Sequence, residues 1–495
     1  MLRTLIPEMR CPYCSGNMRI SRETIGDAER LQYGLLSCRC FEFPVVDGIP
    51  LLSLAKGYGG SEESLQPYVP LQVAAIRYLQ KDDVAGLRAW IARHLPIADE
   101  LMNDRAGAYV PFLARMMLDV DKANSEYLIQ NSTYEFLGYP QPTSPIKRLL
   151  GNAWLNRWRR RKRNKVAHKD WRAWELQQLV GYFPARFFSP RVNALALQLG
   201  SLPMGGKILS LCCGHGVFEN VLSLLGKKQD VVSIDGQFLN LLVTRRYVYP
   251  EGSFICHDLQ FPFPFKNGYF DGVFSSTCLP EIPAQKSFVS EAVRVTRDTG
   301  WTFMDSIWNL DIGVQRIDPQ RGYRFCQNFF TDLEDYLPFF EDCAPNRDLA
   351  LDVPALPEQY KDRSTWILQR DAMISAIKSR TDWQISIVAT TPGRFPGFIT
   401  PAARTWFKPD ALAVSPAYDI ASISPDRVEL KRRALFAQAQ RGFVPKAMTE
   451  LPEQVSLQRG RFNDAAYLSE QFCAGVLVAL PQDFDSVSTR LTSLH

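Results

Sequence analysis

The feature that most constrains this chain is a short apolar run that leads directly into a glycine-bearing turn. Lys207–Leu211 has the length and composition of a buried strand, and Gly214 and Gly216 follow it, before an amphipathic stretch at residues 217–225. Glycines in a strand-to-helix turn let the backbone approach a ligand without hindrance from a Cβ atom, and the helix start presents free N–H groups to that ligand. This order predicts an α/β unit with a ligand site at the turn.

Acidic residues follow the next predicted strands. Four strands are expected, at residues 207–211, 231–235, 253–256 and 272–275. The second ends in Asp235, and the third is followed by Asp258. An acid at the end of the second strand is placed to accept hydrogen bonds from two ribose hydroxyls. Alternating strands and amphipathic segments between 186 and 391 are typical of repeated βα units around a parallel sheet.

In this order the motifs resemble those of the class I S-adenosylmethionine-dependent methyltransferases, in the branch that acts on small molecules. Residues 261–271, 291–300 and 384–389 are similar to the family's later motifs, the last of them to its final antiparallel strand. The resemblance implies a Rossmann-like doubly wound sheet and S-adenosylmethionine as cofactor, with Asp235 on the ribose and Asp258 near the adenine amino group. The cofactor-binding residues that it implies are Ser210, Cys212, Gly214, Gly216, Asp235, Gly236, Asp258, Leu259 and Ser275.

Two positions depart from the family's pattern. Ser210 stands where the family usually has an acid, and Cys212 stands where it usually has glycine. A hydroxyl does not attract the cationic methionine end of the cofactor as a carboxylate does, and Cys212 puts a side chain where the backbone lies closest to the ligand. We therefore expect weaker or altered cofactor binding. A non-catalytic adaptor that retains the fold is the alternative to an enzyme.

Methyl transfer asks the protein chiefly to align a nucleophile with an activated methyl group, and a general base helps only when the acceptor must lose a proton. Glu281, shortly after the fourth strand, is the candidate base. The plainer interpretation is a solvated acid at the start of a helix. His215 and His257 are expected to be structural, because each lies inside a cofactor-loop motif.

The rest of the chain divides by pattern, since 495 residues exceed what one hydrophobic core organises. We expect a zinc-ribbon segment at 1–54, a mostly helical insert with a basic run at 55–185, the α/β domain at 186–391 and a C-terminal extension at 392–495 without strong periodicity. In the insert, a helix is expected after Asp82 or Asp83, because apolar residues recur on one face from Val84 to Leu95.

Four cysteines near the N-terminus are spaced as metal ligands. Cys11 and Cys14 form a C-x-x-C turn, Cys38 and Cys40 form a C-x-C turn, and two such turns enclose a tetrahedral Zn²⁺. The segment resembles the small zinc-ribbon activator of tRNA and protein methyltransferases, whose closing motif is similar to residues 43–52. A closed four-cysteine site implies a structural zinc. The alternative is a retained fold without metal.

The eleven cysteines form an odd set without a regular framework, which favours reduced thiols. No apolar stretch approaches the roughly 18–20 residues needed to cross a bilayer. The N-terminus also lacks an apolar signal core. We therefore expect a cytoplasmic protein without a membrane partner.

A basic run lies at residues 147–169, which contain ten Lys and Arg and no acid. The remainder then has 47 basic and 52 acidic residues, a net charge of −5. Arginines interleaved with tryptophans suit phosphate contact and base stacking. The favoured interpretation is a helix with its tryptophans packed inward, because a net-negative remainder repels nucleic acid. We expect a small-molecule or peptide acceptor first and RNA second.

Overall fold

The computed structural model describes most of the N-terminal region, the central sheet and parts of the C-terminal region. The described residues are 1–52, 68–103, 186–187, 189–202, 205–224, 230–279, 282, 284–308, 333–352, 384–390, 409–433, 451–481 and 488–494. The basic run at 147–169 and the candidate base Glu281 lie outside them.

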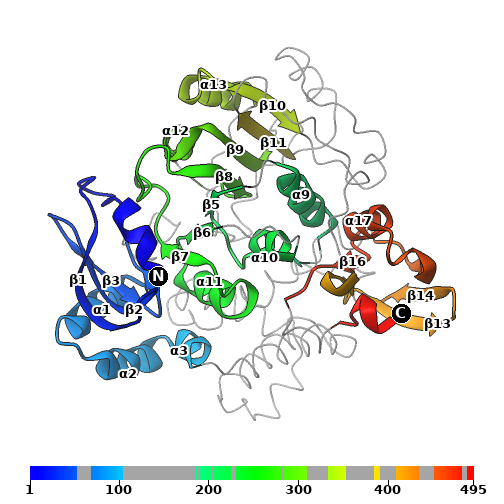
Figure 1. The fold of residues 1–495 in the computed structure, drawn as a ribbon, viewed down its shortest axis with the longest axis horizontal. Coiled ribbons are helices and arrows are strands. Elements are labelled where there is room, and N and C mark those ends of the chain that lie inside the picture. Colours follow the sequence, from blue (N-terminus) through cyan, green and yellow to red (C-terminus); the bar gives the residue numbers. More distant parts are fainter. Residues whose placement is uncertain are drawn as a thin grey trace, which may run out of the picture.

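A seven-stranded sheet forms the centre of the described structure (Figure 1). Its strands, in spatial order, are β10 (Asp348–Asp352), β11 (Gln384–Thr390), β9 (Thr296–Trp308), β8 (Phe270–Ser276), β5 (Lys207–Leu211), β6 (Asp230–Asp235) and β7 (Ser253–Cys256). The five strands from β9 to β7 are parallel, and β11 runs antiparallel between β9 and β10. The four predicted strands and the final antiparallel strand are thus confirmed, and the fold is α/β and Rossmann-like.

Helices cover both faces of this sheet. They are α9 (Pro190–Ser201), α10 (Val217–Leu224), α11 (Phe238–Val243) with the π-helical turn η4 (Thr244–Val248), α12 (Gln285–Val295) and α13 (Leu333–Cys343). Successive strand residues point to opposite faces. Ile208 and Val231 therefore belong to one core with α9, α10 and α11, whereas Leu209 and Val232 belong to a second core with α12 and α13. Because both faces are buried, strands such as β5 and β6 carry apolar residues on both faces.

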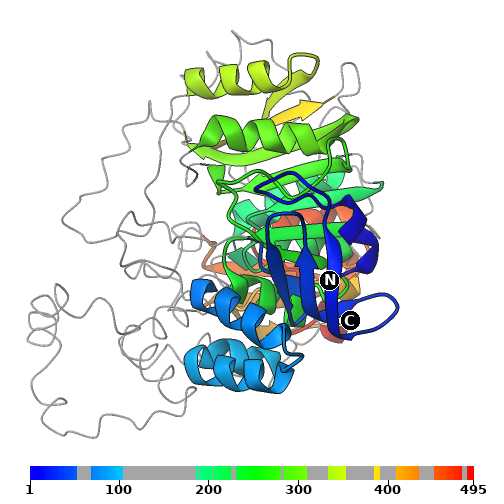
Figure 2. The ribbon, with the colours of Figure 1, turned by 90° about the vertical axis from the view of Figure 1, so that its left-hand side faces the viewer.

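The N-terminal unit is a small antiparallel sheet beside the β7 edge (Figure 2). Its elements are η1 (Arg3–Glu8), β1 (Arg19–Gly26), β2 (Leu31–Ser37), β3 (Glu42–Val46) and β4 (Ile49–Pro50). Asp47 and Gly48 join β3 to β4 with φ of 48° and 74°, the left-handed conformations that tight hairpin turns require. The chain then reaches the central sheet, where the Leu52 N–H donates to the Cys256 carbonyl at 2.9 Å.

Three helices follow in the described part of the predicted insert: α1 (Tyr68–Leu79), α2 (Val84–His94) and α3 (Pro96–Met102). The predicted helix is confirmed as α2. Asp83 is its N-cap and accepts a hydrogen bond from the Gly86 N–H at 2.7 Å. Val84, Leu87 and Ile91 on its apolar face are buried. None of the helices in the described ranges is long and apolar enough to span a membrane.

The C-terminal region contains regular structure that the sequence analysis did not predict. Its elements are η10 (Pro409–Ala411), β12 (Ala413–Val414), β13 (Tyr418–Ile423), β14 (Arg427–Arg432), β15 (Gln454–Gln458), η11 (Arg459–Arg461), α17 (Ala465–Cys473), β16 (Leu477–Val478) and η13 (Leu491–Leu494). It packs on the central domain, where the side-chain amides of Asn193 and Asn220 donate to the carbonyls of Phe472 and Ala479, both at 2.8 Å.

Candidate cofactor site and cysteine cluster

The predicted cofactor residues converge at the carboxyl ends of β5, β6, β7 and β8. Cys212, Gly214 and Gly216 lie in the loop after β5, and Gly236 follows Asp235 at the end of β6. Asp258 and Leu259 follow β7, while Ser210 and Ser275 are the second-to-last residues of β5 and β8. The carboxyl edge of a parallel sheet is where such folds bind ligands. The structure thus brings together all nine residues in one place.

The loop after β5 depends on its glycines. Gly214 and Gly216 have φ of 55° and 72°, and Cys212 also has a positive φ of 55°. A Cβ at Gly216 would lie 2.3 Å from Thr244 Cγ2, so this glycine allows close packing against η4. The Thr244 hydroxyl donates to the Gly214 carbonyl at 2.9 Å. Cys212 therefore occupies a conformation that favours glycine.

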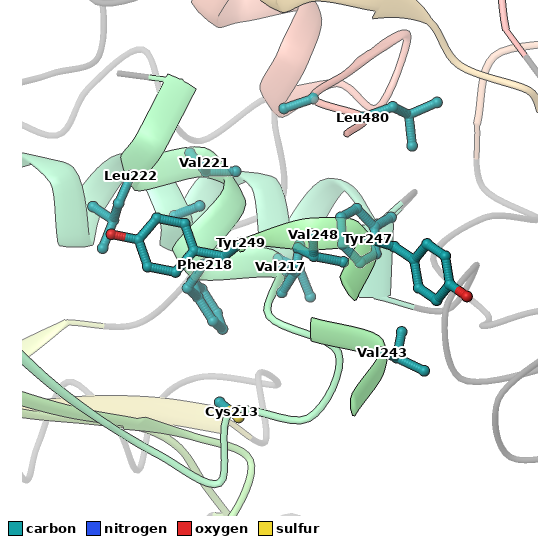
Figure 3. Close-up of a cluster of buried hydrophobic side chains, with 14 of the residues drawn as sticks. Cys213, Val217, Phe218, Val221, Leu222, Val243, Tyr247, Val248, Tyr249 and Leu480 are labelled. Carbon is teal, nitrogen blue, oxygen red and sulfur yellow. The ribbon is translucent and has the colours of Figure 1, made fainter. Parts of the chain in front are cut away.

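A cluster of apolar side chains packs on the helix side of this loop (Figure 3). Val217, Phe218, Val221 and Leu222 of α10 pack in the same core as the side chains of η4, and Leu480 of the C-terminal region belongs to it. The α10 helix start is thereby held against the sheet.

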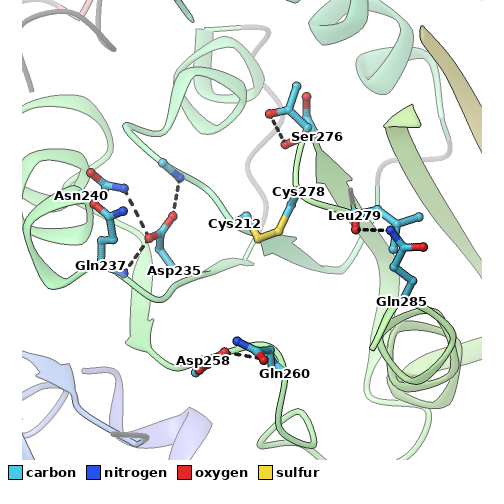
Figure 4. The surroundings of a disulfide bond; sticks show 12 residues. Cys212, Asp235, Gln237, Asn240, Asp258, Gln260, Ser276, Cys278, Leu279 and Gln285 are labelled. Atoms are coloured by element: carbon cyan, nitrogen blue, oxygen red, sulfur yellow. Dashed lines mark hydrogen bonds between the residues drawn. A yellow bond between two sulfur atoms is a disulfide. The ribbon is translucent and has the colours of Figure 1, made fainter. Parts of the chain in front are cut away.

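Asp235 connects the loop to the next helix (Figure 4). Its Oδ2 accepts from the Gly214 N–H at 2.9 Å, and its Oδ1 accepts from the Gln237 N–H at 2.7 Å and from the Asn240 side-chain amide at 3.3 Å. Burial raises the pKa of this carboxyl, and these donors oppose the rise. Asp235 is thus fixed at the site by three protein donors.

Asp258 lies on the neighbouring turn and is also buried. Its Oδ1 accepts from the Gln260 N–H at 3.0 Å. Burial raises the pKa of the Asp258 carboxyl as well. Two carboxylates therefore follow adjacent strands, as the sequence predicted.

Cys212 and Cys278 form a disulfide between the loops after β5 and β8 (Figure 4). The expectation of reduced thiols is wrong for this pair. The two cysteines are 66 residues apart in sequence, but β5 and β8 are neighbouring parallel strands, so their following loops meet at the same edge. The other cysteines within the described ranges are not in disulfide bonds.

A small cavity of about 10 Å³ lies beside the disulfide. Arg186, Ser210 and Ser276 line it, together with the glycine loop. Ser276 donates to Asp305 Oδ2 at 2.8 Å, and Asp305 is a buried residue of β9. The Arg186 guanidinium donates to the Thr277 hydroxyl. Sequence reasoning missed Arg186, Ser276 and Asp305, because no motif marks them.

The two histidines of the site are fully buried. Burial lowers the pKa of His215 to about 3 and that of His257 to about 4. One ring nitrogen of His257 lies 3.1 Å from the Pro262 carbonyl. Both rings are therefore neutral near pH 7.

The four N-terminal cysteines lie together, and their Sγ atoms are all within 4.8 Å of one another. Cys11 and Cys40 are 3.5 Å apart at sulfur, and Cys38 and Cys40 are 3.3 Å apart. A tetrahedral zinc with Zn–S bonds of about 2.3 Å has sulfurs about 3.8 Å apart. The donor set and its spacing therefore fit one zinc ion.

Residues 209–304 match the protein family described as "Methyltransferase domain". This chain carries an S-adenosylmethionine-dependent methyltransferase domain. The matched segment runs from β5 into β9 and contains the glycine loop, Asp235 and Asp258. A comparison with curated proteins finds no match to the enzyme's sequence.

Solved methyltransferase structures are similar to parts of the enzyme. A complex of the Haloferax volcanii Trm112 methyltransferase activator with a methyltransferase is 18% identical, covers 44% of this chain and 96% of that chain, and has a TM-score of 0.33. Phosphoethanolamine N-methyltransferase 2 of Haemonchus contortus is 18% identical, with 47% and 60% covered and a TM-score of 0.33. Geranyl diphosphate C-methyltransferase of Streptomyces coelicolor is 15% identical, with 40% and 79% covered and a TM-score of 0.31.

The side chains at the sheet edge are of chemical types that suit the polar groups of S-adenosylmethionine. Ser210 Oγ and Ser275 Oγ are buried and have no hydrogen-bond partner within the described part of the chain. Buried polar atoms are normally hydrogen-bonded, so unpaired ones at this edge are suited to a polar ligand. Asp235 and Asp258 add acceptors for hydroxyl and amino donors.

Proposed function

We propose that the enzyme transfers the methyl group of S-adenosylmethionine to a small molecule or peptide at the carboxyl edge of the central sheet. The observation that carries this proposal is the convergence of the glycine loop with Asp235 and Asp258, next to the buried Ser275 hydroxyl, which has no hydrogen-bond partner among the described residues. Bound S-adenosylmethionine supplies a methyl group on a cationic sulfur. The protein then contributes mainly orientation, which is worth about 7–11 kcal/mol in well-aligned reactions.

In this proposal, the acceptor binds next to the loop after β8. Ser276 and Arg186 line the cavity there. The Arg186 guanidinium offers hydrogen-bond donors, and Ser276 Oγ, whose hydrogen is donated to Asp305, offers an acceptor. Asp305 positions the Ser276 hydroxyl through its 2.8 Å hydrogen bond. The acceptor is held by few polar groups on a rigid edge, which suits a compact ligand.

A methyl-transfer assay tests this proposal. The full-length protein is incubated with methyl-tritiated S-adenosylmethionine and three separate acceptor pools: a small-molecule extract, a peptide digest and total RNA. We expect label in the small-molecule or peptide pool. Label confined to RNA would instead support the alternative that the basic run at 147–169 binds the substrate.

We also propose that Cys11, Cys14, Cys38 and Cys40 hold one structural Zn²⁺, which makes the N-terminal sheet a zinc ribbon. The mutual distances of the sulfurs support it. Metal analysis of protein purified without chelator is expected to find about one zinc per chain. Cys11→Ser should lose it, whereas Cys343→Ser, a free cysteine on α13, should keep it. Wild type without zinc contradicts the proposal.

A further inference from the structure

A carboxylate that no motif marks lies under the cofactor loop. Glu219, in the first turn of α10, has an exposed fraction of 0%. Its Oε1 accepts from the Ser233 hydroxyl at 2.9 Å, while its Oε2 has no hydrogen-bond partner among the described residues. Leaving a buried carboxylate oxygen unpaired is unfavourable for folding. The Glu219 carboxylate is therefore suited to a ligand that donates a hydrogen bond to it.

Strand register places this carboxylate next to the predicted cofactor residue Ser210. Ser210 on β5 pairs in register with Ser233 on β6, so their side chains share one face of the sheet. Glu219 contacts that face through Ser233. The Ser210 hydroxyl acts on the Glu219 carboxyl, and Ser210 lines the cavity together with Val217 and Phe218, the residues directly before Glu219.

The surroundings of Glu219 provide hydroxyls and further acids. Burial raises the pKa of the Glu219 carboxyl, and the groups that lower it are the Ser210 hydroxyl, its own backbone N–H and the Ser233 hydroxyl, not a cation. Asp235 raises this pKa further by charge repulsion. Because no protein cation balances the carboxylate in these interactions, it gains most from a positively charged donor.

We propose that Glu219 and Ser210 together bind the ammonium group of the methionine end of S-adenosylmethionine. An ammonium group carries three donors and a positive charge, which match the Glu219 carboxylate and the neighbouring Ser210 hydroxyl oxygen. In this arrangement, Glu219 on α10 supplies the carboxylate that the family usually has at the position of Ser210. This inference rests on the proposed function, because it assigns residues to the same cofactor site.

Calorimetry with two ligands tests the assignment on the full-length protein. S-adenosylmethionine carries the ammonium group, whereas 5′-methylthioadenosine keeps the adenosine and lacks the amino-acid end. Glu219→Gln keeps the shape and removes the charge. We expect it to weaken S-adenosylmethionine binding about 10- to 100-fold, the range of a lost charge-assisted hydrogen bond, and to leave 5′-methylthioadenosine binding within about threefold.

Two further variants complete the design. Ser210→Asp combined with Glu219→Gln returns a carboxylate to the same face, and we expect it to restore most of the lost affinity. Glu470→Gln, an exposed acid on α17, serves as the matched control and should bind both ligands as wild type does. Unchanged S-adenosylmethionine binding by Glu219→Gln would overturn the assignment, as would an equal loss for both ligands. Wild type that binds neither ligand would refute the proposed function itself.

Discussion

The N-terminal sheet is held to the methyltransferase domain by a buried ion cluster, and loss of this cluster should lower the free energy of unfolding. Asp47 contacts the Arg245 guanidinium at 2.5 Å and the Arg246 guanidinium at 3.0 Å. The Asp47 side chain is 6% exposed and that of Arg245 is 12% exposed. Arg245 also donates to the Gln32 side chain at 2.9 Å. One carboxylate therefore balances two largely buried cations across the junction.

Asp47→Asn removes this charge and keeps the left-handed turn, since asparagine tolerates positive φ. Loss of one partner from a buried pair costs about 3–5 kcal/mol, because the remaining charge stays uncompensated. The matched control is Asp419→Asn, which breaks an ion pair of 2.9 Å to Arg433 with Asp419 59% exposed. Exposed pairs contribute less than about 1 kcal/mol.

Urea denaturation followed by far-UV circular dichroism measures both variants. We expect the free energy of unfolding to fall by about 3–5 kcal/mol for Asp47→Asn and by less than about 1 kcal/mol for Asp419→Asn. Equal losses in the two variants would refute the reasoning, because burial would then make no difference.

Three further results are expected. Reduction of the Cys212–Cys278 disulfide, or Cys278→Ser, should lower the free energy of unfolding by roughly 4 kcal/mol, because the bond closes a 66-residue separation; equal melting of oxidised and reduced wild type contradicts this. Gly216→Ala should destabilise the protein and abolish cofactor binding, whereas Gly205→Ala, with nothing within 4 Å of its Cβ, should do neither in thermal melts and calorimetry. The raised Asp235 pKa means that the native state binds this proton more tightly than the unfolded state does, so the stabilisation is present below the unfolded pKa near 4 and is lost as pH rises. Wild type should therefore lose stability relative to Asp235→Asn from pH 4 to 8 in thermal melts. A stability difference that stays constant over this range would argue against it.

The sequence predicted the central sheet well because the signals there are local. Strands β5 and β7 begin and end where the apolar runs do, since both faces of a parallel strand are buried. Asp83 was predictable as an N-cap because capping depends on residues within one turn. The cofactor residues follow the same logic, since they lie directly after the predicted strands.

The features that the sequence did not predict depend on contacts between distant segments. The disulfide requires knowing that β5 and β8 are neighbours. Glu219 reads as an ordinary acid at a helix start until the register of Ser210 and Ser233 is known. In the C-terminal region, the alternating pattern of Arg427–Arg432 was the available signal for β14, but it spans only one short strand.

Cofactor binding by the carboxyl edge of the sheet is tested most directly by calorimetry with S-adenosylmethionine on wild type and Asp235→Ala. The control is Asp230→Ala, an exposed acid at the other end of the same strand. We predict binding at one site per chain, unchanged in Asp230→Ala and weakened in Asp235→Ala by about 2–4 kcal/mol, roughly 30- to 1,000-fold in the dissociation constant. Absence of binding by wild type, or equal binding by Asp235→Ala, would contradict the account.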